Sequence, residues 1–392
     1  MPFIMFLINP ILWLLSMIES FCKSSRSSKW GVIVATAMVF FFLGYSIELT
    51  NANADLGQYF SWFPNYENAN YSYLWDEAVS EKNIFVLQQF MLAFFGKLHN
   101  NNLFTGFIVT VFYLCYMYIV TTYLQRTRWQ GIHSVKKEAA IIFGLLIISF
   151  GWVLTSVRNP MANALLAVAI FRDLDLHKNG AVTLLFYVMA LSMHVAVLPI
   201  IICRVLVGIF SSRSLWRCVL SVLAGGVLIC VALYSNVTST TSDKISTYGF
   251  GSSGGGFAGY ARSSFYYQVN SLFLLLLMLL TLVLITILKR QQAPLDRTFR
   301  RFLTTVSALA ILSYFSPTPL IDRYGMFVEI FMPLLIVNIN FRRITEKFRT
   351  SFAVGLIMIG IFGFLWQIAF LSFQINIAGL MVAIAKSWFS LL

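Results

Sequence analysis

The sequence has few charges, few histidines and few cysteines. Only 11% of its 392 residues are charged, whereas 59% are hydrophobic and the mean hydropathy is +0.79. Because so little polar surface cannot cover a soluble globule of this size, the composition predicts a lipid environment. None of the five cysteines has metal-ligand spacing to a histidine. These shortages argue against a disulfide framework and a structural zinc site.

The positive charge is present in a regular pattern. The chain carries a formal net charge of +13, and 21 of its 28 lysines and arginines fall in short segments between apolar stretches. These six segments are 23–29, 126–137, 172–178, 204–217, 289–301 and 342–349. Positive charge between spans marks the cytoplasmic face of a membrane protein. Because the basic residues are dispersed and not gathered on one surface, we expect no nucleic acid as a partner.

Apolar stretches near the length of a bilayer crossing, about 20 residues, predict an all-α, polytopic integral membrane protein. We expect residues 1–392 to form a single membrane domain with about 11 to 13 transmembrane helices. The predicted spans are 1–18, 30–49, 103–124, 139–157, 160–172, 180–195, 196–211, 216–235, 265–288, 302–318, 325–341, 351–371 and 372–391.

The long loops are predicted on the opposite, outer side. Residues 50–102 form the first, in which the apolar segment 84–98 is too short to cross and is predicted to be an interfacial helix. Residues 235–264 form the second, rich in glycine and serine. Such a loop is either a mobile lid over a site or a plain surface connection.

Arginines on the outer side need an explanation other than topology, because charge near the bilayer is costly. Arg158, Asn159 and Asn163 stand in a turn and the following helical turn, next to Pro160, which is suited to a helix start. A helix N-terminus adds donors for an anion. The alternative is an arginine that extends to the membrane interface.

Further candidates lie at other outer turns. His194 can transfer a proton or donate a hydrogen bond to phosphate, or it is a packed histidine. Arg323 and Tyr324 follow Asp322, and either Asp322 or Glu329 can neutralise Arg323. Arg262, in the loop 235–264, is equally well explained by solvent exposure.

Together these residues indicate a ligand with both phosphate and sugar. Arginine pairs with phosphate oxygens in a bidentate manner and stays charged. The loop 50–102 brings aromatic residues such as Tyr59 close to carboxylates, a combination that suits sugar rings and their hydroxyls. A membrane protein with both features on its outer side is suited to a lipid-linked glycan.

The chain resembles the Wzy-type polysaccharide and O-antigen polymerases, in particular the EpsG-like group. The resemblance lies in four short motifs between about residues 30 and 345: Asp55-Leu-Gly-Gln-Tyr59, Arg158-Asn-Pro-Met-Ala-Asn163-Ala-Leu, Ser192-Met-His194 and Asp322-Arg323-Tyr324. It implies a GT-C-like fold in the bacterial inner membrane with a periplasmic active side. It also implies transfer of a glycan from an undecaprenyl diphosphate carrier to the non-reducing end of another lipid-linked repeat unit.

The resemblance assigns Arg158, His194 and Arg323 to diphosphate contact or catalysis, and Asp55 to the role of general base, with His194 as the second choice. Arg262, Tyr59 and Tyr324 join Asn159 and Asn163 as expected substrate-binding residues. The implied partners are undecaprenyl-diphosphate-linked repeat units and membrane lipid, with room for a separate chain-length regulator. No cofactor is expected, and no metal, because the outer face shows no paired aspartates and the arginines supply countercharge.

Two other classes of protein fit parts of the pattern: a transporter, and another transferase of the outer face such as a ligase or an acyltransferase. A flippase or other transporter for lipid-linked oligosaccharide also needs cationic residues, but we expect internal repeats and midplane charges there. An O-antigen ligase needs the same diphosphate site, so the sequence separates it poorly from a polymerase. An acyltransferase needs a histidine within the membrane, where His194 is not expected.

Overall fold

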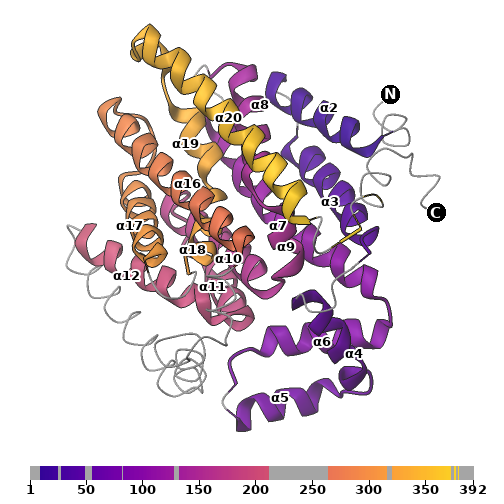
Figure 1. Cartoon of the computed structure of the whole chain (residues 1–392). Coiled ribbons are helices and arrows are strands. Elements are labelled where there is room, and N and C mark those ends of the chain that lie inside the picture. The colour runs from indigo at the N-terminus through magenta and orange to yellow at the C-terminus, as the bar shows by residue number, and fades with distance from the viewer. Residues whose placement is uncertain are drawn as a thin grey trace. The chain divides into compact units, whose positions relative to one another are not determined.

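The protein is helical throughout the part of the chain that the structure describes. This computed structural model describes residues 9–24, 28–48, 55–81, 83–127, 132–211, 264–315, 320–371, 375, 376 and 378, with only the backbone for residues 55, 211 and 347. Every regular element within these ranges is a helix (Figure 1). This confirms the predicted all-α class. The predicted span 216–235 and nearly all of 372–391 lie outside the described residues, as does the loop 235–264 apart from Ser264.

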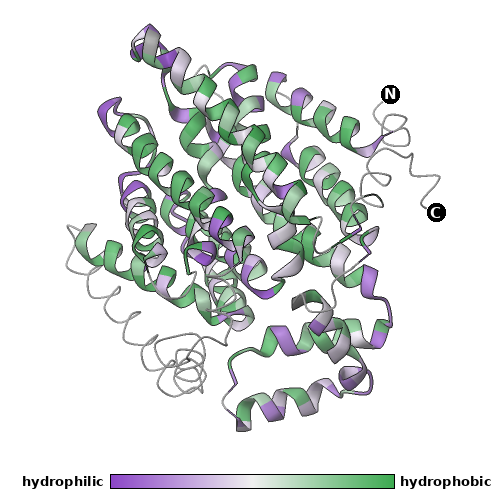
Figure 2. Cartoon of the chain, in the orientation of Figure 1, coloured by the Kyte–Doolittle hydropathy of each residue, from purple (hydrophilic) through white to green (hydrophobic). Residues whose placement is uncertain are grey.

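Three of the described helices are long and apolar enough to cross a membrane. They are α7 (Asn101–Arg126), α16 (Phe265–Arg290) and most of α20 (Glu346–Leu371). Apolar residues dominate all three in Figure 2. These helices indicate a helical membrane protein, whereas the predicted number of spans and the GT-C-like fold stay predictions. Other apolar helices are shorter, among them α3 (Lys29–Tyr45) and α11 (Ala181–Met193).

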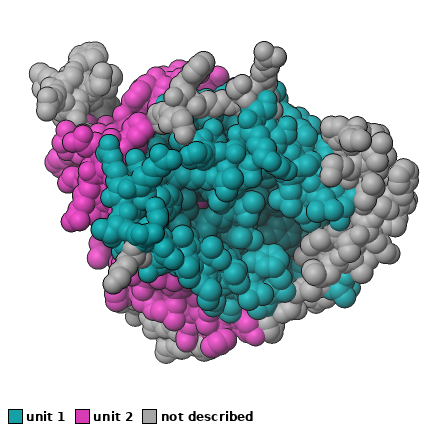
Figure 3. Space-filling model, turned by 90° about the horizontal axis from the view of Figure 1, so that it is seen from above, with its two compact units in different colours: residues 1–68, 92–168, 330–392 teal, residues 69–91, 169–329 magenta. Residues whose placement is uncertain are grey.

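The contacts divide the chain into two compact units, coloured separately in Figure 3. Unit 1 comprises residues 1–68, 92–168 and 330–392, and unit 2 comprises 69–91 and 169–329. Beside α3, α7 and α20, unit 1 holds α2 (Pro10–Lys23), α4 (Asp55–Tyr66), α8 (Ser134–Ile147), α9 (Phe150–Thr155), α19 (Met332–Asn338) and the short turn η4 (Phe341–Arg343). The helices α6 (Val86–Leu98) and α10 (Arg158–Ile170) cross the division between the units.

Unit 2 contains a packed group of helices and a π-helical turn. Besides α11 and α16 it holds α5 (Tyr71–Ser80), the π-helical turn η2 (Phe171–Asp175), the short turn η3 (Val195–Val197), α12 (Leu198–Ser211), α17 (Arg297–Tyr314) and α18 (Ile321–Glu329). The helices α16, α17 and α18 contact one another, and α12 packs on α17. The predicted outer loop 50–102 is itself largely helical, because α4, α5 and α6 fall within it, and α6 matches the predicted helix at 84–98.

Small residues allow close helix packing in unit 1, between α3 and α7. A side chain at Gly44 would place its Cβ 2.8 Å from the carbonyl oxygen of Thr105, and one at Gly106 would place it 3.0 Å from that of Phe41. Beside this crossing the rings of Phe40 and Tyr113 stack with centroids 3.6 Å apart. Such close approach of two backbones is a common way for helices to pack in lipid, where the hydrophobic effect gives little drive for association.

Two predicted spans are not continuous helices, which corrects the sequence prediction. The span 325–341 is interrupted between α18 and α19, where Pro333 cannot donate a hydrogen bond to the carbonyl four residues earlier. The span 139–157 is interrupted between α8 and α9, where no proline is present. In a continuous helix the Phe150 N–H would donate to the Leu146 carbonyl. Here the side chain of Gln367, from α20, bonds to both groups instead. Its Oε1 accepts from the Phe150 N–H at 3.1 Å, and its Nε2 donates to the Leu146 carbonyl at 2.6 Å.

Lys136 has a tertiary role beyond its contribution to the basic loop 126–137. Its Nζ donates to the carbonyl of Ile339 at the C-terminal end of α19, and it lies 5.4 Å from the ring centroid of Phe341. A cation at a helix C-terminus is favourable because carbonyls there lack helical partners. Burial lowers the pKa of the Lys136 amine to about 8.

Gly144, on α8, is a position where we expect a single methyl group to destabilise unit 1. Its Cβ would lie 2.1 Å from the Tyr116 hydroxyl oxygen and 2.6 Å from Cγ of Pro333. Overpacking of this kind typically costs about 1–3 kcal/mol. We therefore expect Gly144→Ala to lower the thermal unfolding temperature of the detergent-solubilised protein.

The matched control is Gly355→Ala on α20, where no atom lies within 4 Å of the added Cβ. Alanine is favoured over glycine inside a helix by about 0.5–1 kcal/mol, so this variant should unfold at the same or a slightly higher temperature. Equal unfolding temperatures for the two variants would contradict the packing described for Gly144.

Candidate functional site

The turn between α9 and α10 holds its residues in an unfavourable backbone conformation. Val157, between the two helices, has φ of 21°. A β-branched side chain rarely adopts positive φ, because its Cβ substituents crowd the backbone. Residues held in this way occur often at functional sites, where the surrounding structure compensates for the strain. The residue placed directly after Val157 is Arg158, the first residue of α10.

Arg158 and Asn159 bring polar atoms into this turn that the described residues do not satisfy. Nε of Arg158 and Oδ1 of Asn159 are both buried, and neither has a hydrogen-bond partner within the described part of the chain. A buried donor or acceptor left unpaired costs about 1–3 kcal/mol, and more when the group is charged. Buried polar atoms retained on consecutive residues at that cost are typical of a site completed by a ligand. Asn163, one helical turn further, is also buried.

The helix N-terminus contributes less to this site than the sequence predicts. Helix α10 begins at Arg158 and not at Pro160. The N–H of Asn159 donates to the Ser156 carbonyl at 3.2 Å, and that of Met161 donates to the Val157 carbonyl at 3.3 Å. Pro160 has no N–H to offer. An anion at this turn would therefore be bound mainly by the guanidinium of Arg158, whereas Oδ1 of Asn159 is an acceptor and suits a hydroxyl donor.

His194 lies in unit 2, between α11 and η3, and only 8% of it is exposed. Its Nδ1 accepts a hydrogen bond from the Ala196 N–H at 2.9 Å. An imidazole nitrogen that accepts a hydrogen bond carries no proton, so the proton of the neutral ring is on Nε2. In this tautomer Nε2 is a hydrogen-bond donor and not a base. His194 is thus arranged to donate toward an oxygen.

Asp322, Arg323 and Tyr324 begin α18, also in unit 2. The buried carboxylate of Asp322 accepts from Nδ2 of Asn270 at 3.1 Å and from the Ser271 hydroxyl at 3.4 Å, both on α16. A carboxylate in the first turn also interacts favourably with the helix dipole. Arg323 is half-buried and the ring of Tyr324 is buried. Glu329, at the end of the same helix, is buried as well.

The remaining predicted site residues contribute less to a described site. Tyr59 is only 1% exposed, and its ring packs on Phe104 with centroids 5.4 Å apart, so it acts here as a core residue. Asp55 is the first residue of α4, and its side chain lies outside the described part of the chain. Arg262 lies outside it altogether.

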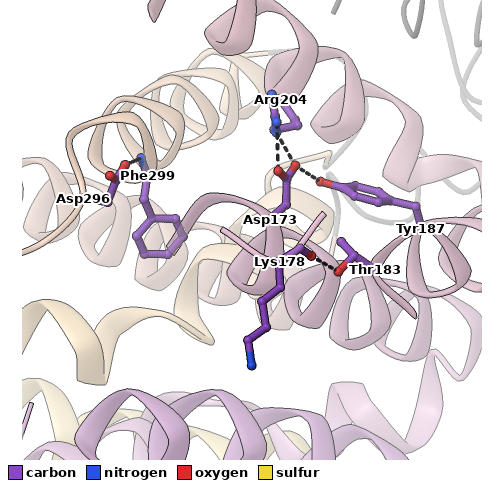
Figure 4. Close-up of polar contacts among 7 residues, drawn as sticks. All are labelled: Asp173, Lys178, Thr183, Tyr187, Arg204, Asp296 and Phe299. Atoms are coloured by element: carbon purple, nitrogen blue, oxygen red, sulfur yellow. Dashed lines mark hydrogen bonds and ion pairs between the residues drawn. The ribbon is translucent and has the colours of Figure 1, made fainter. Parts of the chain in front are cut away.

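Sequence reasoning missed a polar cluster in unit 2 around Asp173 of η2. The Asp173 carboxylate accepts from Nε and Nη2 of Arg204 at 2.5 and 3.0 Å and from the Tyr187 hydroxyl at 2.9 Å, as drawn in Figure 4. Such a bidentate arginine contact is among the stronger polar interactions. It joins η2, α11 and α12, and both oxygens of Asp173 are occupied by protein groups, so we interpret the cluster as structural. Arg204 is 31 positions from Asp173, too far for a sequence pattern to reveal the pair.

The predicted site residues are distributed over both units. Unit 1 contains Arg158, Asn159 and Asn163, and unit 2 contains His194, Arg323 and Tyr324. Within the described residues, no group of three or more histidine, cysteine, aspartate or glutamate side chains is placed to hold a metal ion. The turn at Arg158 and Asn159 is therefore the best-defined candidate site.

Comparisons with protein-family models, with curated proteins and with solved structures find no match to this chain. The described helices indicate a helical membrane protein, and Arg158 and Asn159 at the strained turn are its candidate site.

Proposed function

We propose that the protein is a polysaccharide polymerase that transfers a glycan from an undecaprenyl diphosphate carrier to the non-reducing end of another lipid-linked repeat unit. The observation that carries this proposal is Nε of Arg158, a buried donor at the strained turn that has no hydrogen-bond partner within the described residues. A guanidinium held ready for an anion suits a diphosphate, which gains charge as it leaves.

The reaction needs an anion-stabilising group and a base. A hydroxyl oxygen of the acceptor sugar attacks the anomeric carbon of the donor glycan, the bond from that carbon to the diphosphate oxygen breaks, and undecaprenyl diphosphate leaves with the electron pair. The acceptor hydroxyl loses its proton to a general base. Arginine stabilises the leaving group by electrostatic preorganisation, because it is held in place before the charge develops.

The remaining residues take roles within this reaction. The hydrogen bond at Nδ1 of His194 supports a role as Nε2–H donor to a phosphate oxygen and argues against His194 as the base. Asp55 is accordingly our choice of general base. Arg158 contacts the diphosphate, and Asn159 and Asn163 contribute to substrate binding. Arg323, Tyr324 and Arg262 are further substrate-binding residues that the resemblance implies. No residue in this scheme requires a cofactor.

The location of the reaction follows from the charge pattern. The basic segments between the apolar stretches are proposed to face the cytoplasm, so Arg158, His194 and Arg323 face the periplasm. Lipid-linked repeat units and membrane lipid are then the partners, in a multi-pass protein of the bacterial inner membrane.

The proposal is tested by deleting the gene and complementing it. We expect cells without the protein to carry single repeat units on the outer surface in place of long chains, and wild-type protein to restore long chains. Extracted lipid-linked glycan is resolved by gel electrophoresis, and membrane protein is measured by blot. Unchanged long chains in the deletion strain would refute the proposal.

A flippase for lipid-linked oligosaccharide is the alternative that the interrupted helices favour, because transporters bind substrates at broken helices. At the interruption between α8 and α9, however, the freed N–H and carbonyl are both occupied by Gln367. Repeat units retained on the cytoplasmic leaflet of the deletion strain would favour the flippase. Long chains that form but are not attached to their final lipid would favour an O-antigen ligase.

A further inference from the structure

Helix α5 exposes aromatic rings on a short amphipathic element of unit 2. Leu74 and Ala78 form its buried face. By contrast Tyr71 is 39% exposed and Trp75 is 53% exposed. Exposed tyrosine and tryptophan rings are suited to binding, because each combines a large apolar face with a polar group at its edge.

The two rings are held in place by a third. Tyr71 and Trp75 are one helical turn apart, on one flank of α5. Both contact Phe90, the ring of Tyr71 at 5.8 Å and nearly perpendicular, the ring of Trp75 at 6.5 Å and tilted by 42°. Rings fixed in this way bind a flat apolar surface with little loss of conformational entropy.

Hydrogen bonds at both ends stabilise α5 in this position. Oδ1 of Asn70 accepts from the Ser72 N–H at 3.1 Å and caps the first turn. After the last turn, the Asn83 N–H donates to the Ala78 carbonyl at 2.8 Å, and Oδ1 of Asn83 accepts from the Phe85 N–H at 2.9 Å. The ring pair therefore stands on an ordered element and not on a loose loop.

The charge around this helix is opposite to that of the whole chain. Residues 50–81 contain five acidic and no basic residues, although the protein carries a net charge of +13, and Lys82 follows them. On α5, Asp76 is exposed and Glu77 is half-exposed. Carboxylates accept hydrogen bonds from hydroxyl groups, and their field repels anionic ligands and anionic lipid surfaces.

We propose that Tyr71 and Trp75 of α5 form a platform that binds the uncharged glycan of the lipid-linked substrate. The sugar rings lie on the two aromatic faces, and Asp76 and Glu77 accept hydrogen bonds from sugar hydroxyls. The acidic segment selects against sugars with carboxylate or phosphate groups. This inference rests on the proposed function, and it adds the chemical class of the glycan.

Substitutions on α5 test the platform in complemented cells. We expect Trp75→Ala and Tyr71→Ala to shorten the polymer at least about twofold in modal length, because each removes one aromatic face on which a sugar ring stacks. The matched control is Tyr73→Ala, since Tyr73 is 64% exposed on the same helix but away from the flank that contacts Phe90. Equal chain lengths for Trp75→Ala and Tyr73→Ala, at equal membrane levels, would overturn the platform.

Fluorescence of the full-length protein in nanodiscs separates glycan from lipid as the occupant. We expect oligosaccharide released from the polymer of the same cells to protect Trp75 from quenching by acrylamide. The Trp75 signal is the fluorescence of the wild type minus that of Trp75→Phe. Polygalacturonate, which is anionic, should give no protection. Quenching of the same signal by brominated lipid would instead identify α5 as an interfacial helix. A repeat unit that contains anionic sugars would overturn the charge selection.

The two proposals fail in different ways. If the deletion strain keeps its long chains, the polymerase function is wrong whatever the platform binds. If the deletion removes long chains but the α5 variants leave chain length and Trp75 protection unchanged, the polymerase function stands and the platform is wrong.

Discussion

Arg158→Ala is expected to lower the rate of chain extension by about 10²–10³, the usual effect of removing one preorganised electrostatic contact from a transition state. The variant loses the guanidinium whose Nε is buried without a partner among the described residues. Because that atom has no protein partner to lose, the effect on folding should be small. The rate is measured in membrane vesicles supplied with extracted lipid-linked repeat units, at equal protein levels.

Two further variants decide whether the guanidinium or only its charge matters. Arg158→Lys keeps the charge but not the planar set of donors, so we expect it to recover only a minor part of the rate. Arg349→Ala is the control, because Arg349 is exposed at the start of α20 and pairs only loosely with Glu346, at 3.5 Å. Normal extension by Arg158→Ala would remove this residue from the diphosphate site.

Gln367→Leu is expected to have the largest effect on stability. The buried amide of Gln367 satisfies the Phe150 N–H and the Leu146 carbonyl where α8 and α9 separate. Each buried group left unpaired costs about 1–3 kcal/mol, so the loss of both is worth about 2–6 kcal/mol. We expect a lower unfolding temperature and less protein in the membrane, measured by fluorescence-detected size-exclusion chromatography.

The control on the same helix is Thr350→Leu, which also removes a polar side chain. The Thr350 hydroxyl is exposed and donates only to the Glu346 carbonyl one turn earlier, at 3.2 Å, so we expect little change. A Gln367→Leu protein as stable as wild type would mean that α8 and α9 rejoin into one helix. Because a continuous helix would move the turn at Arg158, its chain extension rate should then be measured as well.

Local patterns in the sequence predicted the helical class and many helix bounds well. The interval 265–288 became α16, 351–371 became most of α20, and 84–98 became α6. Each is a mainly apolar stretch, so removal of its apolar side chains from water and intrahelical hydrogen bonds favour the same structure. Where distant residues decide the outcome, as at 139–157, the prediction of one helix was wrong.

The distribution of positive charge was a less reliable guide to the role of individual basic residues. The sequence assigned Lys136 and Arg204 to basic loops and explained both by topology. In the structure Lys136 caps α19, and Arg204 makes a bidentate contact with Asp173. A cation in a loop and a cation with a tertiary partner look the same in a sequence, because the partner is far away along the chain.

The sequence by itself determined the apolar segments, the distribution of positive charge and the residue types available at each turn, since these depend on composition and spacing alone. Only the tertiary structure decided how those residues are used. It inserts Gln367 between α8 and α9, turns His194 into a donor through Ala196, and leaves Arg158 and Asn159 with buried atoms that no other described residue satisfies. The reason is physical: hydrogen bonding and burial of these groups depend on partners brought close by folding, and local sequence does not specify them.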